Sequence, residues 1–469
     1  MIKGKVKSYS DFNGYGFIAG EDGIDYFAHV SKIVGTDERT LDVGDNVVFI
    51  PCKNAKGGYA AEIRVVSHAK TVNAPSVLKL KKNPFTPQMP ITDASKFAGR
   101  REAIFSAIDA MFNNKNILIS GPRGIGKSSL AYQLLYLTSG ENDLLVRCGI
   151  TETDLFNNII CDYRCMPGNT ITDIAAGLIS SLCDKLNIEL DAGKSTTYGI
   201  DLTIFNASHT DEYQPQALAD TLASFTHQIE KIFSENNDVH NGITFLIDEI
   251  DTLDAETPVA AFLKGAVEKF ALDSYTSFYF LISGITGTVT NMIAQHPSVS
   301  RLFENIALSP LTDEELQELI SSHLMGTGVT STENAIGQII SFSNNFPHPV
   351  QLIGYYAFRF DTDGILDEQD IDKSVKYIVQ NLKQQEFETK FGKLCAGKNV
   401  EILRTMVSSK FPSVSITYLA QNTGLEYQEV AGILGGLIQE GVVEKSFRNQ
   451  YRFVEPMFPI YLKMIFDIG

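Results

Sequence analysis

Residues 121–128 read Gly-Pro-Arg-Gly-Ile-Gly-Lys-Ser, and they follow a short apolar stretch, Lys115–Ser120, that is typical of a strand. A helical pattern, Leu130–Leu137, comes directly after them. A glycine-rich turn between a strand and a helix lets main-chain N–H groups point at phosphate oxygens, and the helix N-terminus adds a partial positive charge. The pattern predicts a phosphate-binding loop whose nucleotide contacts come from Gly121, Gly124, Gly126, Lys127, Ser128 and Ser129.

A second apolar run, Ile243–Ile247, ends in the acidic pair Asp248 and Glu249. Ligands bind at the carboxyl ends of the strands in open parallel sheets, so we expect Asp248 to hold Mg²⁺ together with the Ser128 hydroxyl. Lys127 is expected to contact the β- and γ-phosphates of ATP, while Glu249 orients or deprotonates the attacking water. An acidic pair alone is more often a solvated strand end. Beside the phosphate loop it predicts an ATPase that uses ATP and Mg²⁺.

A third buried run, Phe278–Ile282, ends in Ser283 and Gly284. Its carboxyl end should lie beside the γ-phosphate of the nucleotide, because it belongs to the same edge of the parallel sheet. Ser283 is therefore a candidate for sensing the γ-phosphate, and Thr286 is the alternative.

The segment Phe97-Ala98-Gly99-Arg100-Arg101-Glu102 is preceded by Asn83-Pro84-Phe85 and followed by the phosphate loop. In this arrangement it resembles the start of AAA+ and STAND ATPases. The similarity runs over residues 83–460 and is greatest to the origin-recognition-like and archaeal-type ATPases. The resemblance implies a parallel α/β core with a helical lid, and it places Phe97 and Arg100 on the side of the adenine base.

Two further positions take their expected roles from this resemblance. Arg301 precedes the strand pattern Ile306–Leu308, where relatives place an arginine finger that reaches the γ-phosphate of a neighbouring subunit. A solvated arginine that caps a helix is the alternative. His348 stands where the sensor-two helix of AAA+ proteins carries an arginine. It is either a packed or capping histidine or a phosphate contact.

The first 67 residues alternate between short strand patterns and turn residues, which is typical of a five-stranded barrel of the OB type. Tyr15 and Phe17 share one face of their strand, and Phe27 and His29 share one face of the next. If these strands pair, four flat rings lie together, and base–aromatic stacking is worth about 1–3 kcal/mol per base. The expected strands are Lys3–Ser8, Tyr15–Gly20, Asp25–Val30, Asn46–Pro51 and Ala60–Val66.

This segment resembles a cold-shock domain over nearly its whole length, on the runs Gly4–Lys7, Gly14–Ile18 and Asp25–Val30. The resemblance implies a platform for single-stranded RNA or DNA. Its residues would be Lys7, Tyr9, Tyr15, Phe17, Phe27 and His29.

The barrel departs from the family in ways that weaken such a platform. Ser8, Asn13 and Val30 replace a tryptophan, a lysine and an aromatic residue of the family pattern. Residues 1–67 hold eight Lys/Arg and nine Asp/Glu, which gives a net charge of −1. Rings that merely fill the barrel, or a barrel that binds protein, are the alternatives to nucleic-acid binding.

Residues 398–465 read as three helices and a hairpin, and they resemble the winged-helix domain that follows the lid in origin-recognition-like ATPases. A helix that reads DNA needs basic or amide side chains at its exposed N-terminal end. The third helix, Tyr427–Glu440, has no Lys or Arg. We therefore favour a structural or protein-binding winged helix, although Lys445, Arg448 and Arg452 on the wing leave a phosphate contact open.

The composition of the 469 residues narrows the class of protein. The net charge of −17 argues against a broad basic surface for nucleic acid. No run of about 18 apolar residues and no signal-peptide pattern occurs, and six cysteines fit reduced thiols in a cytoplasmic protein without a membrane partner. The expected parts are a barrel at 1–67, a linker at 68–94, an ATPase core at 95–311 with an insertion at 187–215, a helical lid at 312–392 and a winged helix at 393–469.

Two functions fit these observations. The first is an ATP-hydrolysing AAA+/STAND switch that senses single-stranded RNA or DNA through its barrel, in stress or phage defence. It would act as a homo-oligomer or on a partner effector protein. The second is a nucleotide-controlled scaffold whose barrel and winged helix bind protein partners.

Overall fold

The chain forms two compact units, Met1–Lys82 and Asn83–Gly469, and each is described by itself. The computed structural model describes residues 1–10, 15–34, 41, 44–54, 57–67, 82–150, 156–188, 215–237, 239–382, 387–389, 392, 397–409, 411, 413–445, 449–455 and 457–466. The insertion expected at 187–215 falls almost wholly outside these residues, as does Arg448. Among the described residues, no helix combines the length and the apolar character that crossing a bilayer requires.

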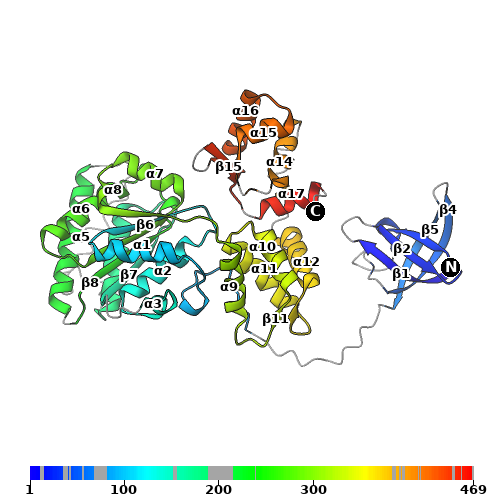
Figure 1. The fold of residues 1–469 in the computed structure, drawn as a ribbon, viewed down its shortest axis with the longest axis horizontal. Helices are drawn as coiled ribbons and strands as arrows, with labels where there is room; N and C mark the ends of the chain where they lie inside the picture. The colour runs from blue at the N-terminus through cyan, green and yellow to red at the C-terminus, as the bar shows by residue number, and fades with distance from the viewer. Residues whose placement is uncertain are drawn as a thin grey trace. The chain divides into compact units, whose positions relative to one another are not determined.

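The N-terminal unit is a closed barrel of five strands, as the sequence predicts (Figure 1). Alternate side chains such as Val6, Ile18 and Phe49 fill its interior, because successive residues of a strand point to opposite faces. A short helix, η1 (Val30–Lys32), follows the third strand. In the order β1-β2-β3-β5-β4, the strands are β1 (Ile2–Ser10), β2 (Tyr15–Gly20), β3 (Asp25–His29), β5 (Gly57–Ser67) and β4 (Asn46–Asn54).

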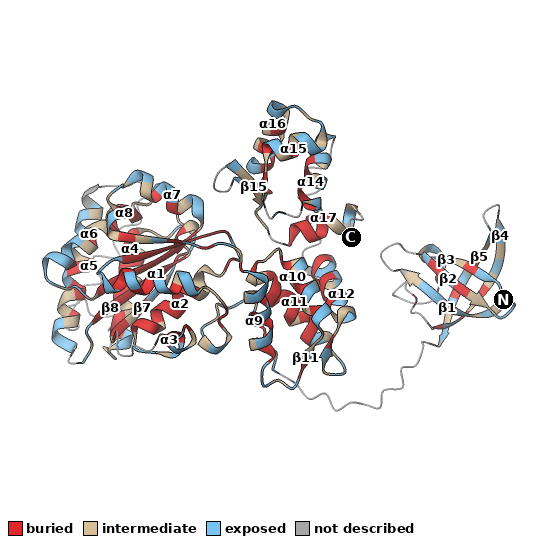
Figure 2. Ribbon diagram, in the orientation of Figure 1, coloured by how far each residue is buried: buried red, intermediate tan, exposed pale blue. Residues whose placement is uncertain are grey.

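The second unit is built on a five-stranded sheet in which every neighbouring pair is parallel. Every residue of β6, β8 and β9 is buried, which explains why these strands read as continuous apolar runs (Figure 2). The carboxyl ends of these three neighbouring strands form one edge. In the order of the sheet, the strands are β10 (Phe303–Ala307), β6 (Asn116–Ser120), β9 (Phe278–Gly284), β8 (Gly242–Asp248) and β7 (Asn158–Arg164).

Helices cover both faces of this sheet. Helices α1, α2 and α3 pack on one face, with Ile117, Ile119 and Leu246. Helices α4, α5 and α6 pack on the other face, with Leu118 and Phe245. The helices are α1 (Arg101–Phe112), α2 (Lys127–Thr138), α3 (Asp143–Arg147), α4 (Ile171–Lys185), α5 (Pro215–Asn236), α6 (Val259–Leu272), α7 (Thr286–Gln295) and α8 (Val299–Leu302), with the short turns η2 (Ala94–Lys96) and η4 (Ile250–Thr252).

A helical lid follows the last strand of the sheet. Capping boxes begin α9 at Thr312 and α12 at Asp367. Its elements are α9 (Asp313–Leu324), β11 (Thr330–Ser331), α10 (Glu333–Ser343), α11 (Pro347–Phe360), β12 (Ile365–Leu366), α12 (Glu368–Tyr377) and η5 (Ile378–Leu382).

The segment that leads into the second unit packs on this lid. The sequence assigns residues 68–94 to a linker, but residues from Asn83 onward belong to the second unit. Asn83 Nδ2 donates a hydrogen bond to the carbonyl of Tyr355 at 2.8 Å, and Phe85 is buried. An apolar ring and a satisfied amide therefore fix this end of the segment, so it is not a free spacer.

The described residues of the C-terminal part form four helices and a small antiparallel sheet in the order β13-β15-β14. The last helix does not stand out in the sequence as a separate element. Lid and C-terminal residues contribute to one cluster of buried apolar side chains. The elements are α14 (Lys398–Ser408), β13 (Val414–Ser415), α15 (Ile416–Thr423), α16 (Tyr427–Gln439), β14 (Val443–Lys445), β15 (Gln450–Phe453) and α17 (Phe458–Phe466).

Candidate nucleotide site and barrel ring face

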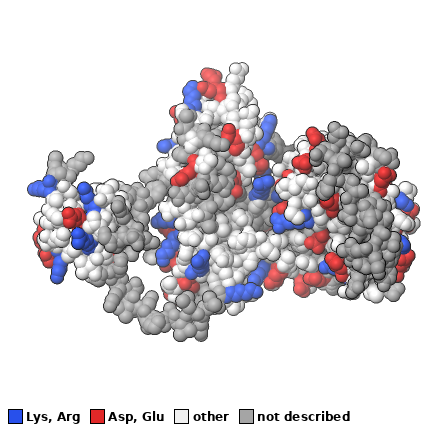
Figure 3. Space-filling view, turned by 180° about the vertical axis from the view of Figure 1, so that it is seen from behind, with Lys and Arg blue, Asp and Glu red and all other residues white. Residues whose placement is uncertain are grey.

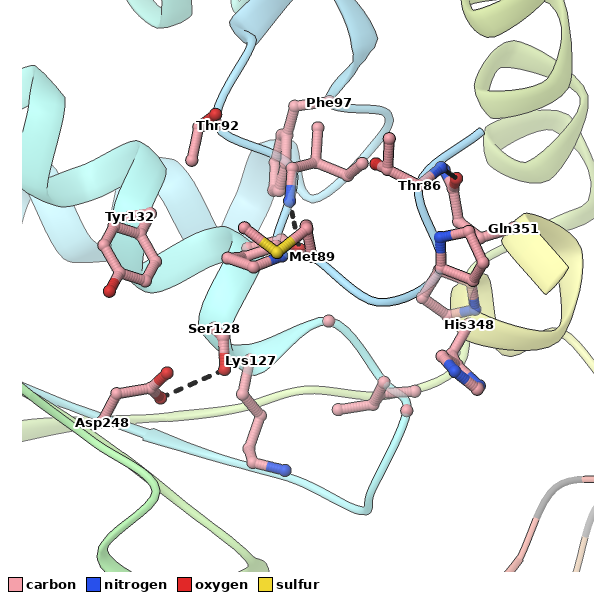
Figure 4. Close-up of a pocket in the computed structure, with 18 of the residues that line it drawn as sticks. Thr86, Met89, Thr92, Phe97, Lys127, Ser128, Tyr132, Asp248, His348 and Gln351 are labelled. Carbon is pink, nitrogen blue, oxygen red and sulfur yellow. Dashed lines mark hydrogen bonds between the residues drawn. The ribbon is translucent and has the colours of Figure 1, made fainter. Parts of the chain in front are cut away.

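A cavity with a volume of about 800 Å³ opens at the carboxyl edge of the parallel sheet (Figure 4). Its walls come from the phosphate loop, the end of β8, the segment before α1 and the start of α11. This volume lies within the range of small-molecule sites. The predicted site residues that line it are Phe97, Arg100, Gly124, Gly126, Lys127, Ser128, Ser129, Asp248, Glu249 and His348.

The phosphate loop turns sharply into α2. Gly126 caps this helix with a φ of 96°, a left-handed conformation that a residue with a Cβ rarely adopts. Gly124 lines the same turn, while Gly121 lies at its start and is not among the described residues that line the cavity. The turn therefore presents main-chain N–H groups and the N-terminus of a 12-residue helix to the cavity.

Lys127 places a buried ammonium group beside this loop. Its Nζ donates a hydrogen bond to the carbonyl oxygen of Pro122 at 3.0 Å. Burial lowers the pKa of Lys127 below its ordinary value, and the carboxylates of Asp251 and Asp248 act against that shift. An anionic ligand in the cavity would meet an ammonium group that already lies beside the loop.

Asp248 is the centre of a cluster of hydrogen bonds. Its Oδ1 accepts from the Ser128 hydroxyl at 3.1 Å and from the Glu249 main-chain N at 3.1 Å. The Ser283 hydroxyl donates to the same oxygen. Within the described residues, the hydrogen bonds of this carboxylate end on Oδ1, which leaves Oδ2 for a cation. Two oxygen donors, Ser128 Oγ and Asp248, thus meet as a hard cation such as Mg²⁺ requires.

Ser283 occupies a different place from the predicted one. It is fully buried behind Asp248, and it is not among the described residues that line the cavity. Its hydroxyl is engaged by the carboxylate because the ends of β8 and β9 are neighbours in the sheet. Ser283 therefore orients Asp248 and does not face the cavity. Thr286, the alternative, is exposed at the start of α7.

Glu249 is held by a residue that the sequence analysis missed. Arg164, at the end of β7, donates from Nε to Glu249 Oε2 at 2.9 Å and from Nη2 to Oε1. This hydrogen bond raises the pKa of Arg164. Arg164 reaches the site because it is the register partner of Asp248 in the parallel ladder. The signal in the sequence was a cation at the carboxyl end of a strand, since Arg164 is the last residue of β7.

Asp251 is a second residue that the sequence analysis missed. Its side chain is only 7% exposed, and it lies 3.9 Å from Arg123 of the phosphate loop. Its Oδ1 accepts a hydrogen bond from the main-chain N of Ile285 at 3.2 Å. Asp251 thus joins the turn after β8 to the turn after β9 and adds negative charge beside Lys127.

Arg100 does not offer its guanidinium to a base. Nη2 donates to the carbonyl of Ile125 at 2.9 Å, and Nη1 donates to the carbonyl of Ser309. Its main-chain N donates to Glu315 of the lid at 2.9 Å. Burial lowers the pKa of Arg100 to about 10, and Glu315 opposes that shift. Arg100 thus ties the phosphate loop to the segment before the lid, while the buried ring of Phe97 remains at the cavity wall.

Ser129 lines the cavity and also makes a contact that the sequence did not predict. Its hydroxyl accepts a hydrogen bond from the main-chain N of Ile91 at 3.0 Å. One helical turn later, Gln133 Nε2 donates to the Ile91 carbonyl at 2.9 Å. Ser129 therefore anchors the segment before α1 to α2.

His348 and Arg301 lie in different settings. The main-chain N of His348, at the start of α11, donates to the carbonyl of Gly124 at 3.2 Å, so the lid touches the phosphate loop. Arg301 is exposed in α8, where its Nη2 lies 3.3 Å from the Ser298 hydroxyl. It is not among the described residues that line the cavity. A role for Arg301 at a neighbouring subunit stays a prediction.

Four rings share the outer face of β2 and β3 in the barrel. Tyr15 pairs with His29 and Phe17 pairs with Phe27 in the antiparallel register. The Phe27 ring centroid lies 5.5 Å from that of Tyr15, 5.9 Å from that of Phe17 and 6.4 Å from that of His29. Tyr15 and Phe17 are each 43% exposed, so large flat surfaces face outward. We call these four residues the ring face.

Tyr9 and Lys7 differ from the predicted platform. A bulge between Val6 and Ser8 shifts the register of β1, so Tyr9 packs against the barrel core instead of joining the ring face. Gly16 stands opposite Tyr9, and a Cβ there would lie 2.0 Å from the Ser8 carbonyl oxygen. Lys7 is exposed, but its ammonium pairs with Asp25 at 2.7 Å.

Comparison with known proteins gives separate results for the two units. The barrel, over residues 2–66, matches the family described as the 'Cold-shock' DNA-binding domain. It is 41% identical over 63 residues to the major cold shock protein CspA of Pseudomonas aeruginosa, a match that covers 13% of this chain and 91% of the relative. Cold shock protein CspB of Bacillus caldolyticus is 40% identical over 63 residues, which covers 13% of this chain and 96% of that protein.

The second unit is similar to solved structures in its fold. A Walker-type ATPase of Pyrococcus abyssi matches with a TM-score of 0.50 and 15% identity, over 80% of this chain and 99% of that protein. At this identity the likeness shows the fold alone, which is that of a Walker-type ATPase with a parallel core. The barrel carries the family assignment: through residues 2–66, this chain belongs to the cold-shock domain family.

Proposed function

We propose that this protein is an Mg-ATP-hydrolysing switch whose barrel binds single-stranded RNA or DNA. The observation that carries the proposal is the meeting of Lys127, Ser128 and Asp248 in one cavity, with Glu249 beside them. Lys127 and Ser128 begin the helix that follows β6, and Asp248 ends β8, so groups far apart in the sequence meet at one edge of the sheet. Phosphoryl transfer to water depends mainly on positioning and charge stabilisation, which such groups supply.

Each residue has a stated role in this proposal. Main-chain N–H groups of the glycine turn and the Lys127 ammonium would bind the β- and γ-phosphates. Ser128 Oγ and Asp248 would hold Mg²⁺, which when bound neutralises charge on the phosphate oxygens. Ser283 would keep the Asp248 carboxylate in place. Glu249 would accept a proton from the attacking water once its carboxylate is free of Arg164.

The ring face supports the nucleic-acid part of the proposal. Stacking on Tyr15, Phe17, Phe27 and His29 is tolerant of base identity, and it does not require a strongly basic surface. On the face of the molecule seen in Figure 3, Lys and Arg side chains of the described residues stand among Asp and Glu. Binding should therefore rest on stacking more than on phosphate charge and should depend only weakly on salt.

The C-terminal part fits a winged helix that binds protein. Three helices lead to the hairpin of β14 and β15, and the third helix, α16, carries no Lys or Arg. On the wing, Arg452 is bound to Glu444 at 2.7 Å, which removes one cation from phosphate contact. Such a module suits an effector protein or a second subunit. A setting in stress or phage defence is an analogy from this modular layout.

Two substitutions test the proposed ATPase. Lys127→Ala should abolish ATP binding, because it removes the buried ammonium group that lies beside the glycine turn. Glu249→Gln should keep ATP binding and block phosphate release. Unchanged turnover in Glu249→Gln would remove Glu249 from the proposed role. Single-stranded oligonucleotides that neither bind nor change the ATPase rate at low salt would remove the nucleic-acid role.

One observation favours the scaffold as a second candidate. Both oxygens of Glu249 are engaged by Arg164, so hydrolysis would be slow while that pair persists. A protein that binds ATP and holds it unhydrolysed would act as a nucleotide-controlled scaffold for protein partners. Native mass measured with and without ATP and oligonucleotide separates the two candidates, because a switch should change its assembly with both ligands.

A further inference from the structure

The segment Thr86–Ile91 forms one wall of the cavity and is fastened at both ends. Every residue from Thr86 to Ile91 lines the cavity. At one end the main chain of Thr86 is bonded to the lid, and at the other the main chain of Ile91 is bonded to α2 through Ser129 and Gln133. We call this segment the strap. It joins the lid to the helix that carries Lys127 and Ser128.

Gln351 makes the bond at the lid end. This residue of α11 is only 5% exposed and lines the cavity. Its Oε1 accepts from the main-chain N of Thr86 at 3.0 Å, and its Nε2 lies 2.8 Å from Nε2 of His323. Figure 4 shows Gln351 bonded to Thr86 on the side of the cavity away from Asp248. Both ends of a buried amide are therefore used.

Three hydrogen bonds link Thr86, Gln351, His323 and Leu319 in series, and main-chain atoms at the two ends of the series fix which group donates in each bond. The Thr86 N–H can only donate, so it fixes the Gln351 oxygen toward Thr86. The Leu319 carbonyl can only accept, and it lies 2.8 Å from His323 Nδ1, so Nδ1 carries the proton. His323 Nε2 is then an unprotonated acceptor for the Gln351 amide. No other assignment satisfies all the groups.

His323 is locked in place by its surroundings. It is fully buried in α9, and its ring stacks on Phe85 with centroids 5.2 Å apart and planes 11° apart. Phe85 itself lies over Gly354, where a Cβ would come within 2.6 Å of the ring. The main-chain N of Phe85 donates to Asn83 Oδ1 at 3.0 Å. The residues just before the strap are thus packed against the same lid helix that carries Gln351.

We propose that Gln351, oriented by His323, is a positioning residue that sets the base-side wall of the nucleotide cavity by holding the strap at Thr86. This inference rests on the proposed function. The phosphates would be bound at the opposite side, by the glycine turn and Lys127. Loss of the Gln351 bond would therefore weaken contacts to the base and leave the phosphate contacts intact.

The test compares a ligand with a base and a ligand without one. Gln351→Met keeps the size of the side chain and removes both polar ends. Calorimetry with ATP and with tripolyphosphate, both with Mg²⁺, should show an affinity for ATP that is lower by about tenfold, as expected for one buried hydrogen bond. The affinity for tripolyphosphate should not change, which also shows that the variant is folded.

Two further variants complete the experiment. His323→Asn keeps a donor toward Leu319 and removes the acceptor for Gln351, so it should weaken ATP binding in the same selective way. Gln338→Met makes the same chemical change in α10 of the lid, away from the cavity, and should alter neither affinity.

The outcomes separate the inference from the function on which it rests. Wild-type affinity for ATP in both Gln351→Met and His323→Asn would overturn the inference, as would an equal loss for ATP and tripolyphosphate. Failure of the wild-type protein to bind ATP would instead overturn the proposed function.

Discussion

Arg164 donates hydrogen bonds to both carboxylate oxygens of Glu249 across the ends of two neighbouring parallel strands, with Nε 2.9 Å from Oε2. The pair forms because β7 and β8 are in register up to Arg164 and Asp248, which places the arginine one residue from Glu249. Two-pronged pairs of this kind fix a carboxylate in orientation as well as in charge. The structure therefore shows each carboxylate oxygen of Glu249 in a hydrogen bond with Arg164, so a water molecule would have to share these oxygens with the guanidinium.

Breaking this pair should speed ATP hydrolysis. Arg164→Ala should raise kcat by about two- to fivefold, because an exposed ion pair is worth less than about 1 kcal/mol. Arg164 is 63% exposed in its side chain, so its loss should not affect folding. Phosphate release under saturating Mg-ATP measures the effect. Arg164→Lys, which keeps the charge, should remain near the wild-type rate, and a fall in kcat for Arg164→Ala would show that Arg164 contacts the nucleotide.

The ring face should lose single-strand binding when its central ring is removed. Phe27 stacks near three other rings, so Phe27→Ala should weaken binding of a single-stranded oligonucleotide by about 1–3 kcal/mol. Fluorescence anisotropy at low salt measures the change. Ile24→Ala removes an exposed apolar side chain from the turn between β2 and β3 and should leave the affinity unchanged. Equal losses in the two variants would contradict the assignment.

Acid should destabilise the lid through His323. Burial lowers the pKa of His323 to about 4, from an ordinary value of 6.5. Between these values the unfolded chain binds a proton that the folded protein excludes, so stability falls as the pH falls through this window. The free energy of unfolding should fall by about 3 kcal/mol over the whole window. Denaturant unfolding at pH 7.5 and pH 4.5 measures it.

A variant without the titrating ring isolates this contribution. His323→Asn should be less stable than the wild-type protein at pH 7.5, because it removes the Gln351 contact. Its stability should also fall less between the two pH values, since all other titrating groups are shared. Parallel pH profiles for the two proteins would show that His323 does not titrate as described.

Helix α16 should become more stable when a half-buried glycine in its middle is replaced. Gly435 lies in the middle of this helix, and a Cβ there would meet open space. Gly435→Ala should stabilise the protein by about 0.5–1 kcal/mol, because glycine loses more main-chain freedom in a helix. Thermal unfolding measures the shift. Gly424→Ala is the control: Gly424 ends α15 with a φ of 72°, so alanine there should destabilise.

The sequence predicted those parts of the fold and site that depend on local patterns. Patterns of a few residues are enough to predict the glycine turn, the five barrel strands and the buried strands β6, β8 and β9. Asp248 is predicted because it directly follows an apolar run. The comparisons support the cold-shock barrel and the Walker-type fold. Contacts that depend on distant register were not accessible, and the pair of Arg164 and Glu249 is the clearest case.

Other differences have equally specific causes. The bulge in β1 reverses the side on which Tyr9 points, and no residue type in that strand reveals it. Arg100 and Ser129 carry side chains that suit a nucleotide, but their partners are main-chain atoms of Ile125 and Ile91. A motif specifies the side chain that is present, whereas a main-chain partner becomes known only with the path of the chain.

The strap has one consequence that concerns any partner of this protein. The strap is bonded to the lid at Thr86 and to α2 at Ile91. The affinity for a ligand that contacts the strap therefore depends on the positions of both the lid and α2. Thermodynamic reciprocity then applies: the factor by which ATP changes the affinity of a lid-binding protein equals the factor by which that protein changes the affinity for ATP. A protein that binds the lid would thereby change the affinity for ATP from outside the cavity, without contacting a phosphate.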